Sequence, residues 1–162
     1  MMKENLIVYE SPIGAIGLAE TGGKLTRLFW VRKDSDTENF AQAETPVLTE
    51  AAKQLAEYFS GTRKAFDLPL NPAGTDFHKT VWRELIAIPY GEVTTYGALA
   101  KKIGSPKACR AVGGANNRNP IALIIPCHRV VGHNNALTGF AYGLDRKQFL
   151  LDLERAKQSE IS

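Results

Sequence analysis

The pattern of hydrophobic and polar positions changes near the middle of the 162-residue chain. In the first third, the β-prone runs "LIVYE", "GAIGLAE" and "LTRLFWV" are separated by the turn-forming stretches "SPI" and "TGGK". This spacing predicts an antiparallel meander of two to four strands. Residues 33–45 are polar and are expected to form a loop. Apolar residues then recur at helical spacing over residues 46–59, with Gly61 as a stop signal, and "KAFDLPL" (64–70) is expected to add an edge strand.

From Phe77 onward the pattern is mainly helical. The stretch "FHKTVWRELIAI" predicts a helix whose inward face carries Phe77, Val81, Leu85 and Ile88. Residues 146–157 predict a final helix, with Phe149, Leu150 and Leu153 facing inward.

Two short helices are expected between these. Thr94 or Thr95 can cap a helix that runs to about Lys102, and Ser105-Pro106 predicts the start of a second helix with proline at its first position. The pair is a candidate helix-turn-helix. An αα-hairpin without a role in nucleic-acid binding remains the alternative.

These elements predict an α+β protein with two domains. The boundary is expected within "NPAGTD" (71–76), which gives an N-terminal antiparallel sheet-plus-helix domain over residues 1–76 and a C-terminal helical domain over residues 77–162. Residues 1–76 carry 8 Lys/Arg and 11 Asp/Glu, whereas residues 77–162 carry 12 Lys/Arg and 6 Asp/Glu. The basic half suggests contact with a polyanion.

Composition excludes several classes of protein. No apolar run reaches the roughly 18 residues that a membrane span needs, and the N-terminus is too short and too charged for a secretory signal. The two cysteines, Cys109 and Cys127, make no disulfide framework, and with the three histidines they form no recognised zinc spacing. We therefore expect a cytoplasmic protein without membrane contact.

The strongest chemical signal is "IALIIPCHRVVGH" (121–133), where an apolar run ends in Cys127 and His128. Pro126 favours an exposed turn at the end of a buried, strand-like run. A thiol reacts as thiolate, and an adjacent base supplies that state. The expected arrangement is a relay from Cys127 through a water to His128 and on to a carboxylate, for which we choose Glu154. From the Cys-His pair alone, an inert buried thiol remains the alternative.

Three stretches read together resemble the O6-alkylguanine-DNA alkyltransferase family: "TTYGALAKKIGSPKACRAVGGANNRNP", "NPIALIIPCHRVVG" and "GLDRKQFLLDLE". The resemblance covers residues 77–162 densely and the N-terminal half more loosely. It implies a small N-terminal domain of RNase H-like fold and a C-terminal domain with a winged-helix-like helix-turn-helix.

The resemblance also implies a reaction. The protein would bind double-stranded DNA through the minor groove, rotate O6-alkylguanine out of the stack and transfer the alkyl group to Cys127. O4-alkylthymine is a second candidate substrate. The thioether product cannot be hydrolysed at such a site, so the protein would act once, as a monomeric methylated-DNA–protein-cysteine methyltransferase without cofactor. No cysteine precedes Cys109, so no zinc site is expected.

Site roles carry over from the family motif residue by residue. The resemblance implies that the relay consists of Cys127, His128 and Glu154 and that Asn119 orders the loop that carries the cysteine. Tyr96 would press on the phosphate of the rotated nucleotide, and Arg110 would fill the gap that the base leaves. The remaining expected DNA contacts are Thr95, Gly97, Ser105, Lys107 and His133, and the alkylguanine pocket is expected to be lined by Val130, Phe140, Ala141 and Tyr142.

Two of these positions depart from the usual family residues. Tyr142 stands where many members have glycine, and His133 stands where a small polar residue is common. Arg129 is expected to pair with a carboxylate of the N-terminal domain.

Three other functions compete with alkyl transfer. Alkyltransferase-like proteins bind the lesion without transferring the group, but they lack the reactive cysteine, which is present here. A transcription regulator and a cysteine hydrolase are further alternatives. The hydrolase would leave Arg110 and Tyr96 unexplained.

Overall fold

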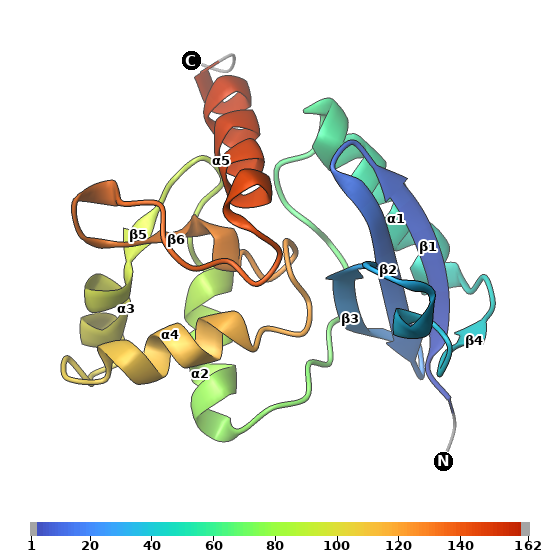
Figure 1. The fold of residues 1–162 in the computed structure, drawn as a ribbon, viewed down its shortest axis with the longest axis horizontal. Coiled ribbons are helices and arrows are strands. Elements are labelled where there is room, and N and C mark those ends of the chain that lie inside the picture. Colours follow the sequence, from blue (N-terminus) through green and yellow to red (C-terminus); the bar gives the residue numbers. More distant parts are fainter. Residues whose placement is uncertain (1–2, 160–162) are drawn as a thin grey trace. The chain divides into compact units, whose positions relative to one another are not determined.

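The computed structural model describes residues 3–159 and confirms the α+β class. The chain divides between Ala73 and Gly74 into two compact units, each of which is described by itself (Figure 1). Residues 71–75 have no regular secondary structure, in keeping with a connecting segment. None of the helices in the described part of the chain has the length and apolar composition of a membrane span.

The N-terminal unit is built on a four-stranded sheet with the order β3-β2-β1-β4. The strands are β1 (Asn5–Ser11), β2 (Gly14–Thr21), β3 (Lys24–Trp30) and β4 (Ala41–Gln42). The first three form the expected antiparallel meander, and β4 adds a short parallel edge to β1. Gly22 and Gly23 both have positive φ (62° and 83°), the conformation that a two-residue hairpin turn requires.

Helix α1 (Pro46–Ser60) packs along this sheet (Figure 1). Its start follows the rules for helix caps, because the side chain of Thr45 accepts a hydrogen bond from the Leu48 amide and proline occupies the first turn. Gly61 ends it with φ 83°, as expected from sequence. The fully buried side chains on the inward face are those of Leu48, Ala51, Leu55 and Tyr58.

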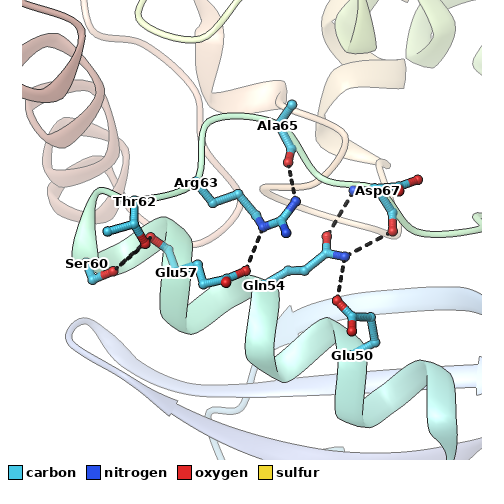
Figure 2. A network of polar contacts seen from close by, with 8 residues as sticks. All are labelled: Glu50, Gln54, Glu57, Ser60, Thr62, Arg63, Ala65 and Asp67. Atoms are coloured by element: carbon cyan, nitrogen blue, oxygen red, sulfur yellow. Dashed lines mark hydrogen bonds and ion pairs between the residues drawn. The ribbon is translucent and has the colours of Figure 1, made fainter. Parts of the chain in front are cut away.

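The segment after α1 does not form the expected edge strand over residues 64–70. Its only bridge to the sheet among the described residues is at Leu70, where Leu25 donates to Pro69 and accepts from Asn71. The preceding backbone groups are taken by α1 and the loop itself (Figure 2): Gln54 exchanges two hydrogen bonds with the backbone of Asp67, at 2.9 and 3.0 Å. Pro69 has no N–H to extend a ladder. The segment is therefore a strap held by side chains.

The same figure shows how the strap begins. Arg63 pairs with Glu57 of α1 at 2.9 Å and donates to the carbonyl of Ala65, and Ser60 and Thr62 both donate to the Glu57 carbonyl (Figure 2). The two hydroxyl groups thus give partners to the Glu57 carbonyl in the last turn of α1.

The C-terminal unit is mainly helical. Its helices are α2 (Asp76–Ile86), α3 (Tyr96–Lys102), α4 (Cys109–Asn117) and α5 (Leu144–Ser159). Two-residue strands β5 (Thr94–Thr95) and β6 (Val130–Val131) pair in parallel. Three-residue 3₁₀ turns occur at η1 (Asp34–Asp36) in the N-terminal unit and at η2 (Cys127–Arg129) and η3 (His133–Asn135) here. Helix α2 is capped by Thr75, and Trp82 anchors it to α4 by donating to the carbonyl of Ala115 at 2.9 Å.

Helices α3 and α4 form the expected helix-turn-helix, with one correction. Thr95 caps α3 by accepting from the Ala98 amide, and Gly104 follows with φ 81°. The second helix begins at Cys109, not at Pro106. The Ala108 amide donates to the Ser105 carbonyl at 2.8 Å, which closes a tight turn with Pro106 at the position where proline suits a turn.

The inward face of α5 also differs from the prediction. Phe149 is exposed and Leu153 half-buried, whereas Lys147, Leu150, Leu151 and Glu154 are buried. The two charged residues lie inside because each reaches polar groups near Cys127. Hydrophobicity alone could not place them there.

Candidate active site

The apolar run before Cys127 is a tight turn and not the expected strand. Asn119 holds this turn from inside, because its side chain accepts from the Ile121 amide at 3.0 Å and donates to the Ile125 carbonyl at 2.7 Å. The Ile125 amide also donates to the Ile121 carbonyl, and Leu123 adopts a left-handed conformation with φ 72°. A non-glycine residue in this region indicates a backbone that its surroundings hold in place.

Cys127 begins η2 directly after this turn. The expectation of an exposed turn is wrong, because only 5% of the residue is exposed. Burial raises the pKa of the thiol, although hydrogen bonds from the Asn119 side chain and the Leu123 backbone and the charge of Lys147 oppose this rise. In the resting protein the sulfur is therefore a neutral thiol, held beside groups that favour the thiolate.

The structure brings His128 together with Glu154. Nε2 of His128 lies 2.7 Å from Oε2 of Glu154, and both side chains are fully buried. Burial lowers the pKa of His128, against the opposing effect of Glu154, so the imidazole is neutral at neutral pH. Burial also opposes ionisation of Glu154, but His128 and Arg129 outweigh it and hold its pKa well below the usual range.

These charge states fix the tautomer of His128. An ionised carboxylate can only accept, so Nε2 carries the proton and Nδ1 has the free lone pair. Nδ1 is buried and has no hydrogen-bond partner among the described residues. It is thus a base that is oriented by a carboxylate, the arrangement typical of activated nucleophile sites.

Arg129 corrects a second expectation. Its guanidinium pairs with Glu154 of the same unit, at 2.8 and 3.1 Å, and not with a carboxylate of the N-terminal domain. It also donates to the Ile88 carbonyl at 2.7 Å and lies over the ring of Tyr90. Since arginine is always charged and its fork matches a carboxylate, this pair keeps Glu154 ionised in a buried place.

The helix-turn-helix is joined to this site by a short sheet. Thr94 and Thr95 of β5 pair with Val130 and Val131 of β6, which follows η2 directly. Tyr96 therefore lies close to the cysteine segment. Burial raises the pKa of its hydroxyl, and hydrogen bonds with Thr138 and Asn116 oppose that rise.

The remaining predicted site residues fall into two sets. Arg110 and the turn residues Ser105 and Lys107 are exposed on the helix-turn-helix, and Thr95 and Gly97 are half-buried at the start of α3. His133 is exposed in η3. Among the pocket residues Val130 is buried and Ala141 exposed, while the half-buried rings of Phe140 and Tyr142 meet edge to face with centroids 5.8 Å apart.

One charged residue of the site was missed by sequence reasoning. Lys147 is fully buried, and its ammonium donates to the carbonyls of Val130, Thr138 and Gly139 at 2.5, 2.6 and 3.2 Å. The available signal was its spacing on α5, seven residues before Glu154 and hence on the same helical face. Within residues 3–159, no group of three His, Cys, Asp or Glu side chains is arranged to hold a metal ion.

Both units match domains of one known protein family. Residues 76–156 match the DNA binding domain of 6-O-methylguanine DNA methyltransferase, and residues 6–72 match the ribonuclease-like domain of the same proteins. The chain therefore belongs to the 6-O-methylguanine DNA methyltransferase family. This match also supports the expected RNase H-like class of the N-terminal unit.

Individual relatives are similar over nearly the whole chain. The methylated-DNA–protein-cysteine methyltransferase of Methanosarcina acetivorans is 53% identical over 149 residues, which cover 91% of this chain and 96% of that protein. The constitutive enzyme of Bacillus subtilis is 48% identical, with 93% and 95% covered. Among solved structures, Mycobacterium tuberculosis OGT in complex with DNA is 44% identical, covers 94% of each chain and superimposes with a TM-score of 0.87.

Proposed function

We propose that this protein repairs DNA by accepting the alkyl group of O6-alkylguanine on the sulfur of Cys127. The observation that carries the proposal is a buried cysteine next to a histidine whose free nitrogen is oriented by an ionised, buried Glu154. This arrangement lies in the unit that matches the DNA binding domain of the family.

The reaction follows from these charge states. Nδ1 of His128 takes the thiol proton through one bridging water, and the thiolate attacks the alkyl carbon in line with the bond to O6. The S–C bond forms as the C–O bond breaks, and the thiol proton ends on the dealkylated guanine, which stays part of the DNA strand. His128, oriented by Glu154, thus generates the thiolate during the reaction. Before the reaction, burial keeps the sulfur of Cys127 in its neutral thiol form.

The product limits the protein to one event. A thioether has no leaving group that this site can activate, so Cys127 is not regenerated. The protein is consumed in proportion to the lesions that it repairs. Because Cys127 is the acceptor and is present, binding without transfer is the less favoured alternative.

The helix-turn-helix provides the DNA surface. Arg110 in the first turn of α4 and Lys107 in the preceding turn are exposed cations, and Arg110 is the residue that we assign to the gap left by the rotated base, since a planar guanidinium stacks on bases. Ser105, Thr95, Gly97 and His133 are assigned to the phosphates. DNA binding is supported by the relative whose structure was solved with DNA, and we propose that one copy of the chain suffices.

Gly97 and Gly113 support a close approach of the backbone to DNA. A Cβ at Gly97 would meet nothing within 4 Å, and one at Gly113 would meet only the Tyr96 ring at 3.9 Å. Neither glycine has the positive φ that would explain its presence. Glycine in a helix is unfavourable by itself, so these two fit a surface that a ligand must approach.

The pocket for the extruded base is assigned to Val130, Phe140, Ala141 and Tyr142. Tyr142 brings a bulky ring to this wall, and its edge-to-face contact with Phe140 restricts its movement. We therefore propose that small alkyl groups, methyl above all, are preferred over bulky ones.

Intact-protein mass spectrometry tests the proposal directly. Incubation with duplex DNA that contains O6-methylguanine should add one methyl group per protein, located by peptide mapping on Cys127. Cys109, which is exposed, is the internal control and should stay unmodified. Cys127→Ser should retain binding to the duplex and gain no mass. Methylation of Cys109, or unchanged protein after the lesion has disappeared, would contradict the assignment.

A further inference from the structure

Asn116 is the polar member of the three buried positions of α4, and only 2% of the residue is exposed. Burying an amide is costly unless its polar atoms find hydrogen-bond partners. The relay of Cys127, His128 and Glu154 does not use this side chain, and neither do the expected contacts to DNA. Its burial beside the cysteine segment therefore calls for a reason.

The amide nitrogen of Asn116 has two partners in the site. Nδ2 donates to the backbone carbonyl of Cys127 at 3.4 Å. Burial raises the pKa of the Tyr96 hydroxyl, and a hydrogen bond with Asn116 opposes that rise, as a donor to the phenol oxygen does. A backbone carbonyl can only accept, so the nitrogen and not the oxygen of the amide faces Cys127. Both hydrogens of Nδ2 are thereby engaged.

The amide oxygen is different. Oδ1 of Asn116 is buried and has no hydrogen-bond partner among residues 3–159. Buried acceptors without a donor are rare in folded proteins, because the hydrogen bonds that they made with water are lost without replacement. Nδ1 of His128 is in the same condition, and its partner belongs to the reaction. Oδ1 is therefore a second open acceptor close to the reactive cysteine.

This amide lies between the cysteine and the segment that leads into the pocket residues. On one side it contacts the backbone of Cys127. On the other side it contacts the hydroxyl of Tyr96, which hydrogen-bonds to Thr138 and lies 3.3 Å from the place of a Cβ at Gly139. The residues assigned to the pocket follow Gly139 directly. A base whose alkyl carbon reaches the sulfur must therefore bring its ring close to this amide.

The chemistry of the two candidate lesions differs at the position that such an acceptor can read. Alkylation at O6 leaves N1 of guanine without a proton, so the exocyclic amine at C2 is the donor that remains on that edge of the base. When the alkylated rings are overlaid, O4-alkylthymine places its O2 carbonyl where guanine has this amine. A carbonyl can only accept, so an open acceptor in the protein suits the guanine lesion and opposes the thymine lesion.

We propose that Asn116 is a specificity-determining residue, whose Oδ1 accepts a hydrogen bond from the exocyclic amine of the extruded O6-alkylguanine and thereby favours this lesion over O4-alkylthymine. The inference rests on the proposed function, with Cys127 as the alkyl acceptor. The backbone carbonyls of Cys127 and Val130 are other acceptors at the site, and each already receives a side-chain donor. Oδ1 is held on a helix, by an amide whose nitrogen is fixed, so it is in place before the base arrives.

The first test changes the substrate. O6-methylhypoxanthine is O6-methylguanine with hydrogen in place of the amine, and each lesion is placed opposite an abasic site in the same duplex, so that neither is paired. The rate of methyl transfer to Cys127 in a single turnover is followed by mass. The parent protein should react about tenfold faster with O6-methylguanine, because one buried hydrogen bond is lost with the analogue. Equal rates would overturn the proposal.

The second test changes the residue. Asn116→Leu has a similar volume and no acceptor, and Asn117→Leu, at the exposed next position of α4, is the matched control. In Asn116→Leu the ratio of the two rates should fall to about two or less, and the preference for O6-methylguanine over O4-methylthymine should shrink with it. The control should keep the parent ratios. Loss of the donor to Cys127 slows all lesions alike, so it cancels in each ratio.

The outcomes separate the alternatives. If Asn116→Leu keeps the parent ratio, the backbone carbonyls read the amine and the proposal is overturned. The substrate comparison needs no variant, so the proposal can fail even where Asn116→Leu does not fold. If the parent protein gains no methyl group on Cys127 from any of these lesions, the proposed function fails instead, which is a distinct result.

Discussion

Oε2 of Glu154 lies 2.7 Å from Nε2 of His128, and neither side chain is reached by solvent. The same carboxylate accepts from Arg129 and from the Gly91 amide at 3.2 Å. Glu154 therefore joins α5 to η2 and to the loop after α2. Its ionised state fixes the tautomer of His128, and through it the direction in which a proton can move. The fold and the chemistry of the site depend on the same pair.

This pair predicts how stability changes with pH. The folded state lowers the pKa of both groups from ordinary values of 6.5 for His128 and 4.5 for Glu154. A lowered pKa means that the unfolded chain binds the proton more readily, so the stabilising effect is present at higher pH and is lost as the pH falls. The free energy of unfolding should therefore decrease below about pH 6.5, by up to about 1.4 kcal/mol per pH unit for one proton, and more steeply below pH 4.5.

Urea unfolding across this range checks the prediction. His128→Gln should remove the part of the slope that begins near pH 6.5, whereas His133→Gln, at an exposed position, should leave it. If the His128 variant retains the slope, another group is responsible.

Replacement of Asn119 is expected to lower both the stability of the protein and the reactivity of Cys127. Its side chain makes two backbone hydrogen bonds that close the turn before Cys127, and both are buried. Asn119→Ala leaves these backbone groups without partners, so we expect a loss of about 1–3 kcal/mol in the free energy of unfolding. The thiol also loses a hydrogen bond that lowers its pKa, so methyl transfer should slow.

Thermal unfolding and single-turnover kinetics measure the two effects of Asn119→Ala. Asn117→Ala, at an exposed position two residues earlier, serves as the control for stability and should change it little. Unchanged stability of the Asn119 variant would show that the turn closes without its side chain.

Much of the framework could be predicted because local rules decide it. The periodicity of residues 46–59 and the stop at Gly61 predicted α1 within one residue, and "TGGK" predicted the hairpin before β3. Thr95 was one of two caps expected for α3 and is the one observed. These features depend on neighbouring residues, which a sequence displays directly.

Most of the errors arose where distant partners decide. Ser105-Pro106 is a local exception: it has the composition of a helix start, but a hydrogen bond from the Ala108 amide to the Ser105 carbonyl closes a turn there. The face of α5 was predicted from apolar residues, whereas Lys147 and Glu154 occupy its buried side because carbonyls and charges of η2 and its surroundings receive them. Arg129 was assigned to the wrong domain for the same reason, since spacing along the chain does not show which carboxylate lies opposite.

Replacement of Gly97 by alanine is expected to raise the stability of the protein and to weaken its binding to DNA. It lies in α3 with open space around its Cα, so Gly97→Ala should fit and should stabilise the helix by up to about 1 kcal/mol. If the backbone approaches a phosphate there, the added methyl group should weaken binding to duplex DNA at least several-fold. Gly104→Ala is the contrasting variant, because φ is 81° and alanine should destabilise the unit. Tighter or equal DNA binding by Gly97→Ala, measured by fluorescence anisotropy, would remove Gly97 from the interface.

Arg110 distinguishes extrusion of the base from the chemical step. Its side chain is exposed at the start of α4, whereas the relay of Cys127, His128 and Glu154 is buried. Arg110→Ala should therefore leave the reaction with free O6-methylguanine base close to that of the parent protein. Repair of the same lesion in duplex DNA should slow by a factor of ten or more, because nothing then fills the gap in the stack, and unstacking a base costs a few kcal/mol.

The test of Arg110→Ala needs a control variant that also loses one positive charge, because phosphate binding alone depends on cations. Arg155→Ala, at an exposed arginine of α5, provides it. If the two variants slow duplex repair equally and added salt reproduces the effect, Arg110 contributes charge only. A defect that is specific to Arg110, and that shrinks when a mismatch opposite the lesion makes the base easier to extrude, places its guanidinium in the stack. The effect of the opposing base distinguishes insertion of the Arg110 guanidinium into the base stack from attraction of its charge to a phosphate. A phosphate contact should not depend on how stably the damaged base is paired.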